Sequence, residues 1–249
     1  MAYAFKIKWL EEVDSTNNEI VRCMDSLDNL SVISAKNQFA GRGQRGNSWK
    51  VSPGDNLTFS VLLRPGEDGV PKVKATDQFR ISQVTTLAVR DLLSAHALSP
   101  SIKWPNDIYI GDKKICGMLI ENTLSGKYIR SSILGIGINV NQTEFDPSLM
   151  NPVSMAVLTG EKYSTEALLE EFCAILGERI PLLDDPRTLG ETYTGYMYRF
   201  GTEYDYTDCR SEEVFKGKIV GVNEQGQLVV EVENGEIKEF GFKEISYII

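Results

Sequence analysis

A glycine-rich, basic segment between residues 40 and 50 constrains the fold of this chain more than any other feature. It reads Ala-Gly-Arg-Gly-Gln-Arg-Gly-Asn-Ser-Trp-Lys, and residues 41–46 match the G-x-G-x-x-G spacing of dinucleotide sites. That fingerprint requires a strand before it and a helix directly after it, so that a pyrophosphate meets the helix N-terminus. A strand over 31–35 is expected, but residues 47–56 carry Pro-Gly and Asp-Asn turn signals instead of a helix. The pattern therefore argues against a doubly wound dinucleotide fold.

Without a helix behind it, this segment has to bind an anion through guanidinium groups and loop amides. Arg42 and Arg45 supply the charge, and three glycines leave the backbone free to move. Ordering about eight such residues costs on the order of 10 kcal/mol, since each fixed backbone costs about 1–2 kcal/mol. We therefore expect residues 41–49 to be mobile without a ligand and to close over one when it binds.

Charge and composition narrow the classes of ligand and partner. The chain has 249 residues, a net charge of −9 and a pI of about 4.8, which argues against DNA or RNA as its main partner. Residues 36–50 are an exception, with four basic residues and no acidic one, so a small anionic ligand is expected there. An apolar content of 42% suffices for one sizeable core, and no apolar run reaches the length of a membrane span.

Cysteine and histidine usage argues against several kinds of catalytic or metal site. The four cysteines are far apart without a C-x-x-C pair, and the N-terminus lacks a signal-peptide layout, so a reduced, cytoplasmic protein is expected. The single histidine, His96, falls near the end of a predicted helix, where a structural role is the stronger interpretation. Ser-His-Asp, Cys-His and multi-histidine metal chemistry therefore lose support.

Apolar periodicity predicts an α+β fold with a largely antiparallel sheet. Helices are expected from about residue 15, over 77–95, from about residue 164 and over 189–198. Strands are expected over 31–35, 56–63, 107–110, 114–121 and 129–140. Thr16 and Glu19 have the spacing of a capping box, and spacing alone favours a helix cap and nothing more for Ser15-Thr16.

The sequence changes character near residue 200. Short strands are expected over 214–222, 228–232, 237–242 and 245–249, joined by Gly226 and by the tight-turn signal Asn234-Gly235. A β-domain of about 50 residues is marginal on its own by size. We place a domain boundary near residue 199, which divides the chain into 1–198 and 199–249.

Two further segments look chemical rather than structural. Lys103-Trp104-Pro105-Asn106-Asp107 could be a strand end with an Asx turn, and glycines in the strand over 135–141 could mark a bulge or close packing. A hairpin strand over 114–121 follows the first of these. Together with the basic loop they supply cations, amides, an indole and close backbone approach, an inventory that suits an adenylate and its polyphosphate precursor.

At these residues the chain resembles the biotin–protein ligases, also called holocarboxylase synthetases. Five family motifs occur in order, as Ser15-Thr16-Asn17, Gly41–Trp49, Lys103–Asp107, Lys114–Glu121 and Gly135–Asn139. Residues 242–245 resemble the closing strand of the family, so nearly the whole chain is covered. The resemblance implies a catalytic domain related to class II aminoacyl-tRNA synthetases over 1–198 and a small SH3-like β-barrel over 199–249. It also implies that biotin and ATP form biotinyl-5′-AMP, with magnesium, and that the biotinyl group passes to a lysine of a carboxylase carrier domain.

The resemblance also implies roles for individual residues. It implies catalytic roles for Arg42, Lys103 and Lys114. It implies a biotin site formed by Ser15, Thr16, Asn17, Gln38, Gly41, Arg42, Lys114 and Gly117. It implies an adenylate site formed by Arg42, Arg45, Trp49, Lys103, Asn106, Lys114 and Asn139. A metal-ligand role is expected of Asp107 alone.

This chain departs from the family pattern at two positions. Many family loops carry arginine where this chain has Gln44 and Asn47, which puts in doubt how tightly the adenylate is held. Our hypothesis is that Arg45 partly compensates and that Lys50 or Lys243 completes the phosphate site. The larger family members carry an N-terminal DNA-binding element for which the sequence shows no room, so no DNA binding is expected. A monomer and a homodimer both remain possible.

Three rival functions remain at this point. A lipoate–protein ligase shares the fold and the reaction type, but Lys103–Asp107 followed by Lys114 favours biotin. A catalytically inactive biotin-binding sensor would not need Arg42, Lys103 and Lys114 together. A nucleic-acid module is disfavoured by the overall acidity and by the lack of an aromatic-basic stripe.

Overall fold

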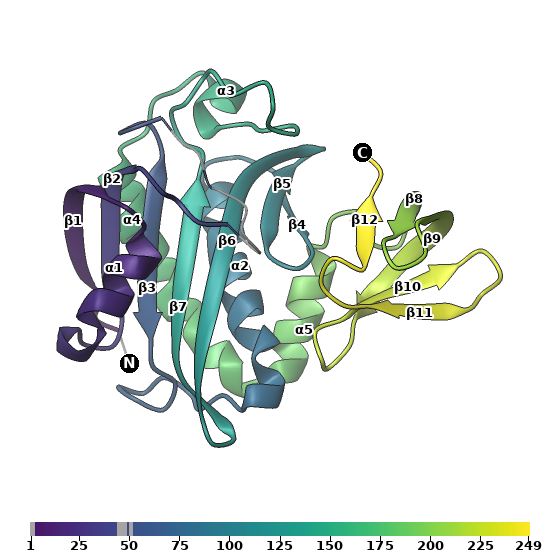
Figure 1. The fold of residues 1–249 in the computed structure, drawn as a ribbon, viewed down its shortest axis with the longest axis horizontal. Coiled ribbons are helices and arrows are strands. Elements are labelled where there is room, and N and C mark those ends of the chain that lie inside the picture. The colour runs from purple at the N-terminus through teal and green to yellow at the C-terminus, as the bar shows by residue number, and fades with distance from the viewer. Residues whose placement is uncertain (1–2, 44–48, 50–51) are drawn as a thin grey trace.

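The structure, a computed structural model, describes residues 3–43, 49 and 52–249 (Figure 1). Its larger sheet has the strand order β1-β2-β3-β7-β6-β5-β4. These strands are β1 (Lys6–Val13), β2 (Ser31–Gln38), β3 (Leu57–Leu63), β4 (Pro100–Lys103), β5 (Asp107–Ile110), β6 (Lys113–Ser125) and β7 (Tyr128–Ile138). Strands β1 and β2 pair in parallel and the other neighbours pair antiparallel, so the predicted mixed, largely antiparallel sheet is confirmed.

Helices cover both faces of this sheet. They are α1 (Thr16–Cys23), α2 (Phe79–Ala95), α3 (Met155–Thr159), α4 (Thr165–Arg179) and α5 (Pro186–Gly195), with short 3-10 helices at Met24–Ser26, Ala75–Asp77 and Ile180–Asp184. In Figure 1, α2 and α4 lie behind the sheet, whereas α1 lies in front of it, near β1 and β2. The α+β fold expected from the sequence is therefore observed.

Strand β3 shows why a strand in a sheet that is covered on both faces has a nearly continuous apolar sequence. Phe59 and Val61 point into the large core with α2 and α4, whereas Leu62 packs with Ile20 of α1 in a smaller cluster on the opposite face. Every residue of β3 is buried. Strict alternation of apolar and polar residues is lost because both faces of a central strand lie against protein.

A second, antiparallel sheet follows in the C-terminal part, with the order β11-β10-β9-β8-β12. Its strands are β8 (Glu203–Asp208), β9 (Glu213–Val222), β10 (Leu228–Val232), β11 (Ile237–Phe240) and β12 (Ile245–Tyr247). Its buried residues Tyr206, Leu228 and Phe240 belong to the same core cluster as α2 and α4. The small size of this sheet is thus offset by packing against the larger one, and the boundary near residue 199 stays a prediction.

The two sheets are held together at named contacts. The Trp104 indole donates through Nε1 to the Gly226 carbonyl at 3.0 Å, and its ring stacks on Phe242 with centroids 5.2 Å apart. Gly226 lies so close to Phe79 of α2 that an added Cβ would sit 2.7 Å from Phe79 Cγ. The contacts of Trp104 place the β9–β10 and β11–β12 turns beside the connection between β4 and β5, and Gly226 also meets α2.

Several elements differ from the sequence-based expectations. Strands β1, β4 and β8 were not expected. In β1 the exposed Lys6 and Lys8 alternate with the partly buried Ile7 and Trp9, but this alternation stops at Leu10-Glu11-Glu12. Helix α5 begins at Pro186, three residues before the prediction, because Asp185 caps it by accepting from the Thr188 amide at 3.1 Å. Helix α3 is one short turn with no clear periodicity.

The single histidine and the four cysteines do not form a metal site with one another among the described residues. His96 is the C-cap of α2, and its Nε2 lies 2.9 Å from Glu171 Oε2 of α4, which agrees with a structural role. All four cysteines are free. Among the described residues, no three metal-binding side chains gather, and no helix is both long and apolar enough to cross a membrane.

Phe172→Ala tests the packing of α4 on the sheet. The Phe172 ring meets Phe59 edge-on with centroids 4.9 Å apart, and both side chains are fully buried. We expect a loss of about 3–5 kcal/mol in the free energy of unfolding, measured by urea denaturation, because the substitution leaves a cavity. Val21→Ala on α1, where the side chain is 57% exposed, is the control and should change the value by less than about 0.5 kcal/mol.

Candidate active site

A single cavity of about 630 Å³ opens over one face of β6 and β7. It is bounded by α1, by the β4–β5 connection and by residues 139–152. It brings together most of the predicted site residues, namely Ser15, Thr16, Asn17, Gln38, Arg42, Trp49, Lys103, Asn106, Asp107, Lys114, Gly117 and Asn139. Segments separated by more than a hundred residues in sequence thus meet at one place.

Three glycines make the floor of this cavity. Gly117 of β6 faces Gly137 of β7 across the ladder, and Leu119 faces Gly135. A Cβ at Gly137 would lie 2.4 Å from the Trp49 indole, and one at Gly135 would lie 2.2 Å from Asn17 Oδ1. Since side chains alternate along a strand, Gly135 and Gly137 clear the same face while their neighbours fill the core. The glycines are therefore needed for packing: without a Cβ at these positions, the Asn17 amide and the Trp49 indole can lie directly against the sheet.

At one end of the cavity, Ser15 occupies the N-cap position of α1 without acting as a cap. Its side chain makes no capping hydrogen bond, and none to its hydroxyl is found among the described residues. Ser15 is only 3% exposed, and it lines the cavity. The interpretation of Ser15 as a helix cap and nothing more is therefore wrong, because its hydroxyl is left available to a ligand.

The Gln38 amide is oriented by Thr16. Its Oε1 accepts from the Thr16 backbone amide at 2.8 Å and from the Thr16 hydroxyl at 3.2 Å. A backbone N–H only donates, so the atom facing it has to be the amide oxygen. The donor group Nε2 is left for another acceptor. Thr16 Oγ1 in turn lies 2.7 Å from Ser60 Oγ of β3, whose single proton is shared between Thr16 Oγ1 and Asn17 Oδ1, so this arrangement is anchored to the sheet.

Asn17 ties α1 to the sheet below the cavity. Its Oδ1 accepts from Ser60 Oγ at 2.5 Å, and its Nδ2 donates to Glu121 Oε2 at 2.7 Å. Asn17 is 3% exposed, so these bonds satisfy a buried amide that would otherwise destabilise the fold. Its predicted contact with biotin stays a prediction beside this anchoring role.

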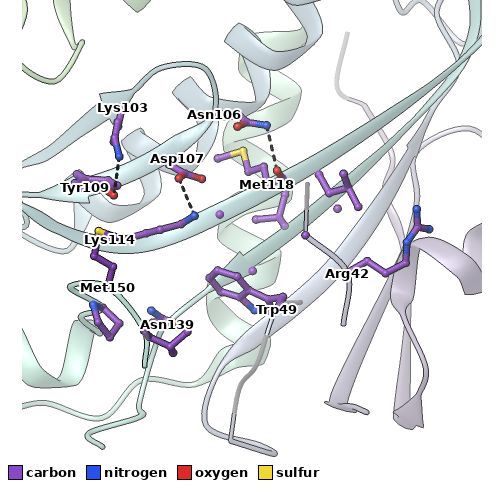
Figure 2. Close-up of a pocket in the computed structure, with 18 of the residues that line it drawn as sticks. Arg42, Trp49, Lys103, Asn106, Asp107, Tyr109, Lys114, Met118, Asn139 and Met150 are labelled. Carbon is purple, nitrogen blue, oxygen red and sulfur yellow. Dashed lines mark hydrogen bonds and ion pairs between the residues drawn. The ribbon is translucent and has the colours of Figure 1, made fainter. Parts of the chain in front are cut away.

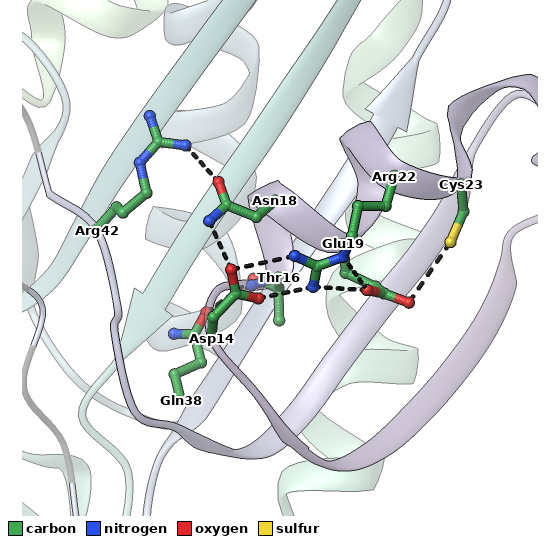
Figure 3. Close-up of polar contacts among 8 residues, drawn as sticks. All are labelled: Asp14, Thr16, Asn18, Glu19, Arg22, Cys23, Gln38 and Arg42. Atoms are coloured by element: carbon green, nitrogen blue, oxygen red, sulfur yellow. Dashed lines mark hydrogen bonds and ion pairs between the residues drawn. The ribbon is translucent and has the colours of Figure 1, made fainter.

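Arg42 is paired with a carboxylate and an amide oxygen. Its Nη2 donates to Glu121 Oε1 at 2.6 Å, and its Nη1 donates to Asn18 Oδ1 at 2.7 Å. Figure 3 shows this chain of contacts continuing from Asn18 to Asp14 and on to Arg22, whose hydrogen bonds hold the pKa of Asp14 well below its usual range. Helix α1 thus presents a polar, pre-ordered edge to the guanidinium.

The other two predicted catalytic cations are also paired, at the opposite side of Trp49 in Figure 2. Lys114 Nζ lies 2.7 Å from Asp107 Oδ2, and Lys103 Nζ donates to Tyr109 Oη at 3.1 Å. Burial lowers the pKa of Lys103, and the same desolvation raises the pKa of Tyr109. The Lys103 ammonium is thus less hydrated than one at the surface, which strengthens its attraction to an anion.

Trp49 lies on the glycine floor. Its indole lies against the backbone of Gly117 and Gly137, its ring centre is 5.9 Å from Lys114 Nζ, and its Nε1 is buried without a partner among the described residues. Its backbone amide donates to the Gly41 carbonyl at 2.9 Å, which brings the two ends of the basic loop together. A flat aromatic face is therefore present in the cavity where a planar ring was predicted to stack.

The two predicted amides of the nucleotide site are buried and hydrogen-bonded to the backbone. Asn106 Nδ2 donates to the Met118 carbonyl at 3.1 Å, and Asn139 Nδ2 donates to the Val153 carbonyl at 3.0 Å. Asn106 is 4% and Asn139 is 5% exposed. These bonds hold the β4–β5 connection and the segment after β7 against the cavity.

Some predictions concern residues that the cavity does not include. Gly41 is not among the lining residues, although a Cβ on it would sit 2.4 Å from the Trp49 carbonyl. Arg45, Gln44, Asn47 and Lys50 lie outside the described residues, so the predicted closing of the loop and the role of Arg45 stay predictions.

Other lining residues were not singled out by the sequence. The segment after β7 contributes Phe145, Leu149, Met150, Asn151 and Pro152 to the cavity. It carries no motif, and only its position after Asn139 could have suggested it. Glu121 appeared in the sequence only as the last residue of a motif, and its ion pair with Arg42 depends on the juxtaposition of the loop and β6.

The cavity offers one carboxylate for a magnesium ion. Among the described lining residues Asp107 is the only acidic one, and its Oδ2 already contacts Lys114. Magnesium is usually held by one or two carboxylates together with substrate phosphates and water. The residues present therefore fit a phosphate-borne magnesium ion with Asp107 beside it, rather than an all-protein cage.

Comparison with known proteins places the chain in a family. Residues 9–139 match the model of the biotin/lipoate A/B protein ligase family. The biotin–[acetyl-CoA-carboxylase] ligase of Paracoccus denitrificans is 32% identical over 168 residues, 65% of this chain and 67% of that protein. The bifunctional ligase/repressor BirA of Bacillus spizizenii is 30% identical over 213 residues, which make up 82% of this chain but only 62% of BirA.

The fold agrees with these similarities. The biotin protein ligase of Aquifex aeolicus, solved in complex with biotin and ATP, superposes with a TM-score of 0.78 and 29% identity, covering 97% of each chain. The match includes both sheets, since it spans nearly the whole chain. The chain therefore belongs to the biotin/lipoate A/B protein ligase family.

Proposed function

We propose that this protein is an ATP-dependent biotin–protein ligase, which activates biotin as biotinyl-5′-AMP and transfers it to a lysine of a carboxylase carrier domain. One observation carries the proposal. A single cavity combines a hydrogen-bonding end at Ser15, Thr16 and Gln38 with four basic side chains from separate elements. A similar protein that covers 97% of this chain was solved with biotin and ATP, which supports the same two substrates here.

The first half-reaction joins two anions. A carboxylate oxygen of biotin attacks the α-phosphorus of ATP, the bond from that phosphorus to the bridging oxygen breaks, and pyrophosphate leaves. We assign Arg42 to the carboxylate and the α-phosphate, because its planar fork binds two oxygens at once. Lys114, on the other side of Trp49, neutralises the charge that the two reacting groups share. Arg42 contacts Glu121 and Lys114 contacts Asp107, and in this proposal each cation exchanges its carboxylate for a ligand oxygen.

The second half-reaction transfers the biotinyl group. The neutral amine of an acceptor lysine attacks the carbonyl carbon of biotinyl-5′-AMP, the bond from this carbon to the AMP oxygen breaks, and the amine loses a proton. A mixed anhydride of this kind hydrolyses in water, so the cavity has to exclude water until the acceptor arrives. Ser15 and Asn106, which line the cavity, are only 3% and 4% exposed, so parts of its wall are shielded from solvent.

Magnesium belongs to the first half-reaction in this proposal. Asp107 would hold it together with the phosphates, and the ion would offset the triphosphate charge during the departure of pyrophosphate.

The hydrogen-bonding end of the cavity favours biotin over lipoate. The ureido ring of biotin carries two N–H donors and a carbonyl acceptor, which match hydroxyl groups and the free Nε2 of Gln38. The dithiolane ring of lipoate carries neither. It would leave the buried polar groups of Ser15 and Gln38 unpaired, at a cost of about 1–3 kcal/mol each. An inactive sensor remains the second candidate, because it would keep the same binding groups.

Biotin-dependent exchange of labelled pyrophosphate into ATP tests the proposed function. We expect exchange with biotin and none with lipoate at the same concentration, since only biotin matches the polar end of the cavity. Exchange with lipoate but not with biotin would instead identify the protein as a lipoate–protein ligase. Binding of biotin without any exchange would instead identify a sensor.

Lys114→Gln should reduce the rate of adenylate formation by about 10²–10³-fold, because it removes one cation from the charge that develops on the reacting oxygens. The control is Lys113→Gln, which changes an exposed neighbour on β6 outside the cavity and should leave the rate unchanged. Single-turnover formation of biotinyl-5′-AMP measures both. Equal rates for the two variants would exclude the role assigned to Lys114.

Ser15→Ala separates a ligand contact from a helix cap. Because the Ser15 hydroxyl makes no capping bond, we expect little change in the free energy of unfolding but about tenfold weaker biotin binding by calorimetry. Ser154→Ala and Ser164→Ala are matched controls, since these side chains do cap α3 and α4, accepting from Val157 and Ala167 amides at 3.1 Å. They should each cost about 1 kcal/mol of stability and leave biotin binding intact. The reverse pattern would return Ser15 to a capping role.

A further inference from the structure

The second sheet reaches the cavity through one basic side chain. Lys243 lies in the turn between β11 and β12 and is among the residues that line the cavity, although the other lining residues come from the first 152 positions. Figure 1 shows β12 beside β4 and β5, the strands that lead to Lys103 and Asp107. Lys243 of the second sheet thus adds a positive charge to a cavity that is otherwise formed by the larger sheet and its connections.

The turn that carries Lys243 is held firmly on the larger sheet. Phe242 stacks on Trp104 with an angle of 26° between the rings. Within the turn, the Gly241 amide donates to Glu244 Oε2 at 2.7 Å, and the Glu244 amide donates to the Gly241 carbonyl at 3.1 Å. Arg210 Nη1 lies 3.5 Å from Glu244 Oε2. The position of Lys243 relative to the cavity is therefore determined by packing on both sides.

Lys243 has a backbone conformation that lysine rarely adopts. Its φ is +65°, in the left-handed region where a Cβ is unfavourable and glycine is preferred. The turn would thus form more easily with glycine at this position. Strained positions of this kind are concentrated at functional sites, and the side chain here is exposed towards the cavity rather than buried for stability.

Lys243 also differs from the other cations of the cavity in its partners. Arg42 contacts Glu121, Lys114 contacts Asp107 and Lys103 contacts Tyr109. Lys243 makes neither a side-chain hydrogen bond nor an ion pair within the described parts of the chain, 3–43, 49 and 52–249. Its charge is therefore available to a ligand without the loss of an existing contact.

The position of the turn indicates which part of a ligand it meets. Lys103, adjacent to Trp104, lies with its Nζ 4.9 Å from the centre of the Tyr247 ring of β12, so β12 and its turn border the Lys103 end of the cavity. The hydrogen-bonding end at Ser15 and Thr16 belongs to α1, on the other side of the glycine floor. An ATP molecule that reacts between Arg42 and Lys114 carries further negative charge on its β- and γ-phosphates.

We propose that Lys243 is a further binding residue for the reaction and contacts the β- and γ-phosphates of ATP, which leave as pyrophosphate. This inference rests on the proposed function, because it assumes adenylate formation in this cavity. It adds that the second sheet takes part in the first half-reaction. Lys243 has no part in the second half-reaction, which involves no pyrophosphate.

Lys243→Gly is the informative substitution, because it removes the ammonium and relieves the left-handed strain together. We expect the variant to be at least as stable as the natural protein. Its dissociation constants for ATP and for inorganic pyrophosphate, measured by calorimetry, should rise about tenfold, which corresponds to about 1.4 kcal/mol. Transfer of biotin from supplied biotinyl-5′-AMP to an acceptor domain should be unchanged.

Two substitutions, one in the β8–β9 turn and one in β9, serve as controls. Glu212→Gly relieves the same strain at φ +63°, and Lys216→Ala removes an exposed lysine away from the cavity. Both should bind ATP and pyrophosphate like the natural protein.

Unchanged ATP and pyrophosphate binding in Lys243→Gly would overturn the proposal, as would equal losses in the two controls. An equal loss in the transfer step would show a structural role for Lys243. Failure of the natural protein to bind ATP or pyrophosphate would also reject it. If the natural protein binds ATP but catalyses no biotin-dependent exchange, the proposed function fails, while the binding comparison still decides the role of Lys243.

Discussion

The absence of side chains at three positions on one face of β6 and β7 is the constraint on which the site depends. Gly117, Gly135 and Gly137 remove three Cβ atoms from adjacent positions of the ladder without interrupting its hydrogen bonds. The opposite face of the same strands carries Ile136 and Ile138, which fill the main core. One face of the two strands therefore packs in the main core, whereas the other face leaves room at its three glycines. The free space admits the Asn17 amide, so α1 and its polar residues can approach the sheet closely.

Charged side chains line the space that the glycines leave in the cavity. The cavity lies in a chain of net charge −9, yet its walls carry basic side chains from the basic loop, from β4 and from β6. Arg42 and Lys114 are each paired with a carboxylate, which limits the repulsion between cations in a partly desolvated space. Such pairs also hold the side chains near the positions where an anionic ligand would need them, so less conformational entropy is lost on binding.

The sequence predicted the elements that have strong local signals. Helices α2 and α4, the β5–β6 hairpin and the C-terminal strands β9 to β11 follow from periodicity, caps and turn residues. Strand β1 was missed because its alternation is short: it covers Lys6 to Trp9 and stops at Leu10-Glu11-Glu12. Spacing alone favoured a helix cap at Ser15, because a hydroxyl before a helix has the same local signature whether or not it caps the helix, and only the structure shows that Ser15 makes no capping bond. The wall at 145–152 has no local signal at all.

The sequence by itself determined the chemical inventory: the basic glycine-rich loop, the period-two glycines at 135 and 137, the cations at 103 and 114, and the family to which these motifs point. It could do so because each motif is encoded within a few neighbouring residues. Only the tertiary structure decided which partners these groups have. The pairing of Arg42 with Glu121, the fixed orientation of Gln38 by Thr16 and the arrival of Lys243 from the second sheet all join residues far apart in the chain. Such contacts depend on how sheets and helices pack, and packing is a property of the whole fold rather than of any local segment.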